Sequence, residues 1–171
     1  MERLPPPPGV TRWFGTYENR ILSNNGLPII SPPWTTLSAI DLNDGTIKWQ
    51  VPLGVAPGLA ARGIRDTGTP KVTLASNRNG PVVTAGGLVF VGTWSDRTVR
   101  AFDKTTGKVL WEQELEANPE GLAAVYEVGG RQYVVFCGAA RPPQTAPGEG
   151  FSWKAGKPDK QGYYVFALPK K

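Results

Sequence analysis

Alternating apolar and polar residues run through the chain from Thr36 onward and predict short β-strands joined by tight turns. Residues 36–42 and 46–53 alternate on either side of Asp44-Gly45, a dipeptide typical of hairpin turns. Further alternating segments follow at short intervals. They are residues 81–85, 88–93, 98–104, 108–115, 121–128, 131–138 and 163–168. The pattern predicts an all-β fold of antiparallel strands.

Three other segments lack this alternation. Residues 1–35 are irregular, with polyproline II structure expected at residues 5–8 and one strand at 11–17. Residues 54–80 form a connection rich in Gly, Ala and Pro, in which residues 58–65 are expected to contain a helical turn. Residues 139–161 form a polar loop. We therefore divide the chain into an irregular segment, 1–35, and a β region, 36–171.

One sequence motif, A-x-D-x-x-x-G-x-x-x-W, occurs twice, at residues 39–49 and 101–111. Its residues are Asp41, Gly45 and Trp49 in the first copy, and Asp103, Gly107 and Trp111 in the second. The Asp side chain accepts hydrogen bonds within a turn, the Gly supplies a positive φ, and the Trp packs against a neighbouring sheet. Because the Asp recurs at equivalent positions, we interpret it as a turn residue rather than a catalytic base. We expect both Trp side chains to be largely buried.

A third, partial copy at residues 165–169 aligns with residues 99–103. A repeat with about four strands per unit is typical of a β-propeller built from antiparallel four-stranded blades. The strands predict about two and a half blades of a partial propeller: a half blade at 36–53, a full blade at 81–115 and a three-stranded blade at 121–169.

The composition excludes several classes of protein. The chain has no histidine, which excludes His-based catalysis and His-ligated zinc, and its single Cys137 excludes an internal disulfide or a thiolate cluster. The net charge of +5 is scattered along the sequence, so we expect no nucleic-acid partner. No apolar run reaches the ~18 residues of a transmembrane helix. The N-terminus lacks the apolar core of a signal peptide.

Three longer segments carry a family resemblance. They are PPWTTLSAIDL at residues 32–42, GPVVTAGGLVFVG at 80–92 and YEVGGRQYVV at 126–135. With the repeated motif, known in this family as the tryptophan-docking motif, they resemble the C-terminal part of the eight-bladed pyrroloquinoline quinone (PQQ) dehydrogenases of the glucose and quinate type. The resemblance extends over residues 15–169.

The resemblance implies a quinoprotein that oxidises a sugar or polyol, as a glucose dehydrogenase does, by hydride transfer to PQQ. A carboxylate base and Ca²⁺ assist the reaction, and a cytochrome or a quinone accepts the electrons. It also implies a periplasmic location. The base and the calcium ligands lie on earlier blades in the family, so we expect this chain to be inactive alone. Its open blade faces would contact the remaining blades or a second copy of the chain.

Within the chain, the segment 76–80 enters the first inner strand and offers the candidate cofactor contacts. In the related alcohol dehydrogenases this junction carries an aromatic pocket residue, which Arg78 and Asn79 replace here. Arg78 would pair with a PQQ carboxylate, and Asn79 would hydrogen-bond a quinone or substrate oxygen. The alternative is a plain turn with an exposed Arg. Asp66 and Asp96 are interpreted as solvated loop carboxylates. The loop 139–161, which contains Phe151 and Trp153, is either a rim that meets substrate or a cytochrome, or an ordinary surface loop.

A second function class is a non-catalytic interaction module. The β-propeller lipoprotein of outer-membrane protein assembly carries the same repeat motif and binds partners through its edges. The long matches at residues 80–90 and 126–135 favour the dehydrogenase type.

Overall fold

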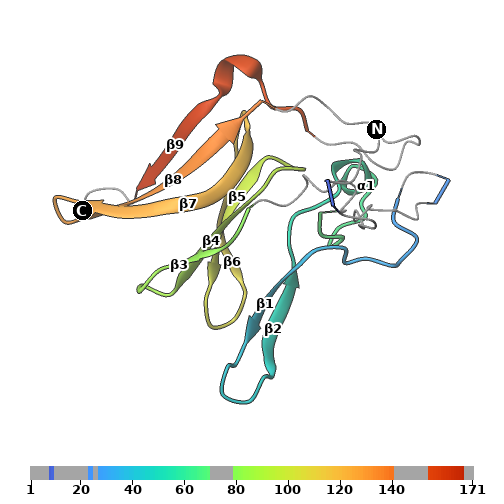
Figure 1. Ribbon diagram of the computed structural model, residues 1–171, viewed down its shortest axis with the longest axis horizontal. Coiled ribbons are helices and arrows are strands. Elements are labelled where there is room, and N and C mark those ends of the chain that lie inside the picture. Colours follow the sequence, from blue (N-terminus) through green and yellow to red (C-terminus); the bar gives the residue numbers. More distant parts are fainter. Residues whose placement is uncertain (1–7, 10–22, 25–26, 70–78, 141–153, 168–171) are drawn as a thin grey trace.

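Three antiparallel sheets make up most of the molecule, in a computed structural model that describes residues 8–9, 23–24, 27–69, 79–140 and 154–167 (Figure 1). The first sheet pairs β1 (Thr36–Ile40) with β2 (Ile47–Pro52). The second has the order β3 (Val82–Val83), β4 (Leu88–Thr93), β5 (Thr98–Asp103) and β6 (Val109–Glu114). The third has the order β7 (Asn118–Val128), β8 (Arg131–Ala139) and β9 (Gly162–Ala167).

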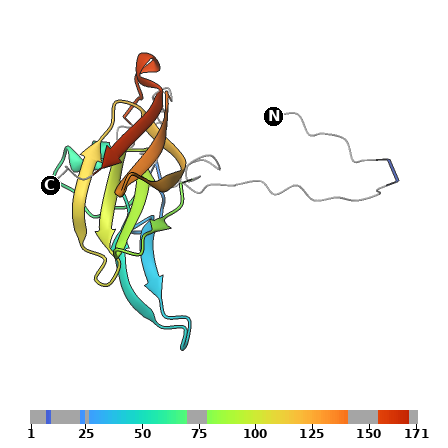
Figure 2. The same ribbon diagram turned by 90° about the vertical axis from the view of Figure 1, so that its left-hand side faces the viewer.

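Each sheet is a meander in which strands that follow each other in sequence are neighbours in space. The described helices are short: α1 (Pro57–Ala60) and the 3₁₀-helix η2 (Pro158–Lys160). The prediction of an all-β fold of partial propeller blades is confirmed. Two views show the sheets stacked side by side, with the four-stranded sheet in the middle (Figures 1 and 2).

Two strands differ most from the predicted bounds. β3 has only two residues, because Thr84 leaves the ladder and closes the following turn by a hydrogen bond from its N–H to the carbonyl oxygen of Leu88, at 2.9 Å. β7 begins at Asn118, earlier than expected, although Pro119 and Gly121 suggest a break. A β-bulge between Glu120 and Ala124 absorbs the extra residues, so pairing with β8 continues on both sides of it.

Two apolar clusters hold the sheets together. Leu37 of the first sheet packs with Val89, Val91 and Phe102 of the second. On the other face, Phe90, Val99 and Ala101 pack with residues of the third sheet that include Val134 and Phe136. β4 and β5 of the middle sheet are therefore buried on both faces, which explains the unbroken apolar run at residues 88–91, whereas β6 is exposed along its length.

The two complete motifs fold in the same way. Ala39 pairs with Trp49 and Ala101 with Trp111, and a bulge follows each Ala. The N–H of each motif Gly donates to the carbonyl oxygen of the motif Asp, at 2.8 Å for Gly45 and 2.9 Å for Gly107. Both glycines have positive φ, 75° and 72°. The internal repeat in the sequence is thus a repeat in the backbone.

The motif aspartates act within their own turns. Oδ1 of Asp41 accepts the N–H of Asn43 at 3.0 Å, and Oδ1 of Asp103 accepts the N–H of Thr106 at 2.8 Å. The hydrogen bond from Lys48 holds the pKa of Asp41 below its ordinary value, and the hydrogen bonds from Thr106 do the same for Asp103. Carboxylates that are held ionised in this way are weak bases.

The motif tryptophans differ in their surroundings. Trp49 reaches the second sheet, where its Nε1 donates to the carbonyl oxygen of Lys104 at 3.0 Å and its ring lies over Gly107. Trp111 packs edge-on against Phe166 of the third sheet at 5.0 Å between ring centroids. Its side chain is 36% exposed, so the expectation that it is largely buried is wrong. Among the described residues, the third sheet has no strand after β9 that could cover the Trp111 side chain.

Candidate functional site

The predicted cofactor contacts are only partly within the described residues. Arg78 and the predicted strand at 11–17 lie outside them, as do Phe151 and Trp153. Asn79 is described and half-buried. Its Nδ2 donates to the carbonyl oxygen of Gly92 at 2.9 Å and to that of Pro119 at 3.0 Å.

This geometry decides what Asn79 can offer a cofactor. The side-chain amide has two N–H hydrogens, and both are directed at backbone carbonyl oxygens. Only Oδ1 is left for a ligand, and it is an acceptor. A quinone oxygen is also an acceptor, so the described residues do not fit the predicted hydrogen bond from Asn79 to a quinone. A hydroxyl donor is the kind of group that Oδ1 can still bind.

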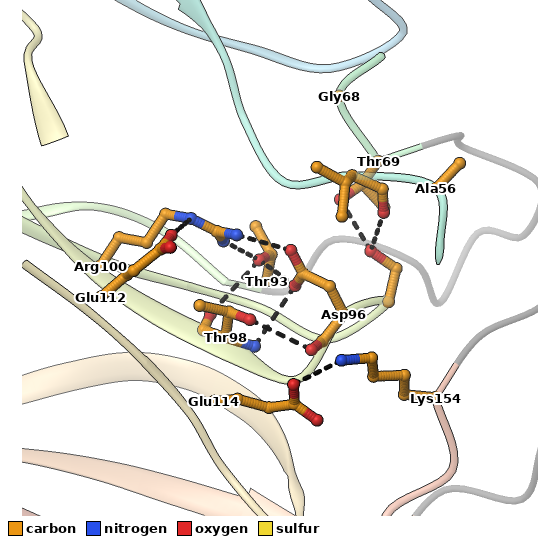
Figure 3. A network of polar contacts seen from close by, with 12 residues as sticks. Ala56, Gly68, Thr69, Thr93, Asp96, Thr98, Arg100, Glu112, Glu114 and Lys154 are labelled. Carbon is orange, nitrogen blue, oxygen red and sulfur yellow. Dashed lines mark hydrogen bonds and ion pairs between the residues drawn. The ribbon is translucent and has the colours of Figure 1, made fainter. Parts of the chain in front are cut away.

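Asp96 is the clearest departure from the expected site. It was expected to be a solvated loop carboxylate, but it is 2% exposed. Its Oδ2 accepts a charge-assisted hydrogen bond from Nη2 of Arg100 at 2.7 Å (Figure 3). Its Oδ1 accepts from Oγ1 of Thr93 at 2.5 Å and from the N–H of Thr98 at 3.3 Å. The prediction for Asp96 is therefore wrong, because these partners compensate for its burial.

Arg100 completes this network. Its Nη1 donates to Oγ1 of Thr93 at 2.6 Å, and its Nε lies 3.3 Å from Oε2 of Glu112. A signal for this arrangement was present in the sequence. Arg100 stands two residues from Phe102 on β5, so both side chains point to the same, buried face of the strand. A charged residue at an inward position requires a buried partner of opposite charge.

A cavity of about 550 Å³ lies beside this ion pair, between the α1 segment and β6. Val55, Pro57 and Ala60 form an apolar wall, and charged side chains form the rest. Among the latter, Glu114 is held between Nη2 of Arg97, at 2.6 Å, and Nζ of Lys154. Burial alone would raise the pKa of Glu114, but the hydrogen bonds from Lys154 and Arg97 outweigh it and lower the pKa.

The chemistry available in this cavity is binding rather than proton transfer. Asp96 and Glu114 already face cationic or hydroxyl partners, and the lowered pKa of Glu114 makes that carboxylate a poor general base. Among the described residues, no three Cys, Asp or Glu side chains gather as a metal site would require. The described part of the chain therefore holds no candidate calcium site.

Buried hydroxyl groups position the connection that follows β2, and no pattern in the sequence indicates them. Oγ1 of Thr69 and Oγ of Ser95 are 3.0 Å apart, and Ser95 also donates to the carbonyl oxygen of Val55 at 3.1 Å (Figure 3). Gly68 has a φ of 64°, and a Cβ there would lie 2.3 Å from the carbonyl oxygen of Thr35. These contacts fix residues 53–69 against the first and second sheets.

Comparison with known proteins identifies a family. The family described as "PQQ: Glucose/ethanol/alcohol dehydrogenase, beta-propeller domain" matches residues 5–134. A probable quinate dehydrogenase (quinone) from Xanthomonas campestris pv. juglandis is 39% identical over 136 residues, which are 75% of this chain and 16% of that protein. The glycerol dehydrogenase large subunit of Gluconobacter thailandicus is 39% identical over 112 residues, 65% of this chain and 15% of the subunit. This chain thus spans about one sixth of the relatives it matches.

Two solved structures are also similar. The quinohemoprotein alcohol dehydrogenase from Comamonas testosteroni is 23% identical, with a TM-score of 0.47, and the match covers 80% of this chain and 18% of that one. BamB from Moraxella catarrhalis is 17% identical, with a TM-score of 0.38, over 77% of this chain and 37% of that one. In the part of the chain that the structure describes, no helix has the length and hydropathy needed to cross a membrane.

Proposed function

The chain belongs to the β-propeller family of the PQQ-dependent glucose, ethanol and alcohol dehydrogenases, and we propose that it forms the C-terminal blades of such an enzyme. We propose that the complete enzyme oxidises a sugar or a polyol. The observation that carries this proposal is the family match over residues 5–134, together with relatives that act on quinate and glycerol. PQQ, when bound, accepts the hydride, and in the proposed enzyme Ca²⁺ accompanies it.

The role of this chain in that enzyme is structural support for the cofactor site. Its described residues gather no set of metal ligands, and we propose that the base and the calcium ligands lie on other blades. Trp49, with its hydrogen bond to Lys104 and its contact with Gly107, supports the proposal that the repeated motif docks each blade onto the next. Arg78 remains the proposed partner of a PQQ carboxylate.

Location and partners follow from the same family proposal. We propose that the complete enzyme works in the periplasm and passes electrons to a cytochrome or a quinone. The remaining blades are the proposed partners of the first and third sheets.

The first experiment is an activity assay. Purified chain, supplied with PQQ and Ca²⁺, is expected to show no dye reduction with glucose, quinate or glycerol, because the base is proposed to lie on other blades. The same chain joined to its preceding blades is expected to reduce the dye with at least one of these substrates, and only when PQQ is present. Activity of the isolated chain would show that the base has been misplaced.

A second candidate function is a non-catalytic interaction module similar to BamB. This candidate is favoured only by the shared blade repeat, and the match to BamB is weaker than the match to the PQQ-dependent dehydrogenases. The two candidates differ in PQQ binding. If the chain joined to its preceding blades bound no PQQ in a titration followed by absorbance, the interaction module would replace the dehydrogenase.

A further inference from the structure

Two asparagine side chains meet at the junction between the second and third sheets. Asn79 comes from the second sheet and donates to its own Gly92 and, across the junction, to Pro119 of β7. Asn118 is the first residue of β7. It donates from Nδ2 to the carbonyl oxygen of Trp94, across the junction, at 2.7 Å and to that of Lys154 at 3.0 Å. The two amides therefore reach in opposite directions across one interface.

The two amides supply hydrogen bonds to buried carbonyl groups, of which that of Trp94 also accepts the N–H of Arg97 at 3.4 Å. Gly92, Trp94 and Pro119 are buried, and Asn118 is 1% exposed. A buried carbonyl without a hydrogen-bond partner costs about 1–3 kcal/mol. Each amide supplies two N–H donors, so four donors meet four carbonyl groups.

The backbones at the junction are also packed too closely to shift freely. A Cβ at Gly92 would lie 2.6 Å from Cβ of Pro119. A Cβ at Gly156 would lie 2.5 Å from Oδ1 of Asn118. The junction is closed further by a backbone hydrogen bond from Lys154 to Ser95, at 2.9 Å. The two amides therefore act within a tightly packed interface.

The junction between the first and second sheets is built differently. Hydroxyl groups of Thr69 and Ser95 join it, and the indole N–H of Trp49 donates to the backbone of Lys104. The paired amides are thus a feature of the second junction among the described residues, rather than a general consequence of stacking two blades.

We propose that Asn79 and Asn118 form a reciprocal inter-blade clamp, which fixes the second and third blades relative to each other, and that Asn79 is a positioning residue rather than a cofactor contact. The clamp is independent of the proposed function, because it rests on contacts within this chain. It fixes the entry into β3 against the end of β4 and the start of β7.

The substitution Asn79→Asp tests the clamp, because it keeps the shape of the side chain and removes its donors. The new carboxylate would face two carbonyl oxygens, which disfavour its charged form and raise its pKa above the ordinary value of about 3.9. A protonated carboxyl can still donate to one carbonyl. The thermal unfolding midpoint of Asn79→Asp is therefore expected to lie below that of the wild type, by a deficit that is small near pH 4 and grows toward pH 7.

Asn24→Asp is the matched control, because Asn24 is exposed. Its unfolding midpoint is expected to follow that of the wild type at every pH. If Asn79 were a solvent-facing amide that waits for a cofactor, Asn79→Asp would behave like Asn24→Asp across the whole pH range. That result would overturn the clamp.

A second measurement uses only the wild-type chain and decides the question if the variant fails to fold. Side-chain amide hydrogens of Asn79 and Asn118, observed by NMR, are expected to exchange with solvent at least about tenfold more slowly than those of Asn24, because their donors are engaged inside the junction. Equal exchange rates for Asn79 and Asn24 would contradict the proposal.

Discussion

Gly107 and Gly130 adopt almost the same backbone conformation, with φ of 72° and 71°, but their surroundings differ. A Cβ at Gly107 would lie 2.6 Å from Cε3 of Trp49, whereas a Cβ at Gly130 would meet nothing within 4 Å. The two positions therefore separate the cost of a positive φ from the cost of disturbing the contact between two blades.

We predict that Gly107→Ala destabilises the chain more than Gly130→Ala. Both variants place a side chain in the left-handed region, at a cost of about 1–2 kcal/mol. Gly107→Ala also forces the Trp49 ring to move, and overpacking of this kind costs a further 1–3 kcal/mol, roughly. Urea unfolding followed by tryptophan fluorescence measures the difference. Equal losses in the two variants would show that Trp49 does not depend on Gly107 for its position.

Arg100 offers a second test at the scale of single residues. Its substitution by Met keeps most of the side-chain volume but leaves Asp96, 2% exposed, without its cation. Breaking a buried ion pair from one side costs about 3–5 kcal/mol. Arg100→Met is expected to lose this much stability in urea unfolding, whereas Lys108→Met, at an exposed position, is expected to lose less than about 0.5 kcal/mol. A loss for Arg100→Met no greater than that control would mean that Asp96 does not need its partner.

At the scale of secondary structure elements, η2 is tied to the second and third sheets by ion pairs. Lys157, just before η2, pairs through Nζ with Oε1 of Glu116 at 2.6 Å, and its N–H donates to the Glu116 carbonyl oxygen at 2.8 Å. The hydrogen bond from Lys157 lowers the pKa of Glu116, and the same hydrogen bond raises the pKa of Lys157.

These two pKa shifts define the pH range in which the ion pair between Glu116 and Lys157 stabilises the fold. Glu116 stabilises the fold above its ordinary pKa of 4.5, and the contribution is lost as the pH falls below that value. Lys157 stabilises the fold below its ordinary pKa of 10.5, and the contribution is lost as the pH rises through the raised pKa. We predict that the unfolding midpoints of wild type and Glu116→Gln differ at pH 7 and converge below about pH 4. The control Glu127→Gln removes the same charge, and its unfolding midpoint is expected to show no such pH-dependent difference from that of the wild type. If it did, the difference seen for Glu116→Gln would reflect net charge and not the ion pair with Lys157.

The strand pattern, the paired turns and the repeat could be predicted because they depend on neighbours in sequence. Asp41, Gly45 and Trp49 belong to one hairpin, and their spacing alone indicates its geometry. The burial of Asp96 and the donors of Asn79 could not be predicted in the same way. Asn79 finds Pro119 forty residues away, and no local periodicity encodes such a contact. Local chemistry identified the blades and the Trp49 contact, and only the packed structure identified the buried polar groups that join the sheets.

At the scale of the whole molecule, the third sheet has one face that no described residue covers fully. Tyr126, Tyr163 and Val165 on this face are 44%, 79% and 52% exposed, whereas Val134 and Phe136 on the opposite face are buried. Contiguous apolar surface of this kind is rare on monomers and marks a contact site. In the complete enzyme another blade is the proposed partner.

We predict that the isolated chain self-associates through this face at micromolar concentration. Val165→Lys places a charge at its centre and is expected to reduce association in sedimentation velocity. Leu110→Lys, a substitution at a residue of β6 that is 54% exposed, is the control and is expected to leave association unchanged. A wild-type chain that sediments as a single 18.4 kDa species over days would contradict the prediction.

The burial of β4 and β5 on both faces also sets the order in which the molecule comes apart. In a linear stack, each sheet is stabilised by its own strands and by the neighbours it touches. The second sheet has two such neighbours, and the first and third have one each. Local opening should therefore start at the outer sheets and move inward, so that the last segment to become accessible to a protease is the one between Leu88 and Asp103, which contains β4 and β5.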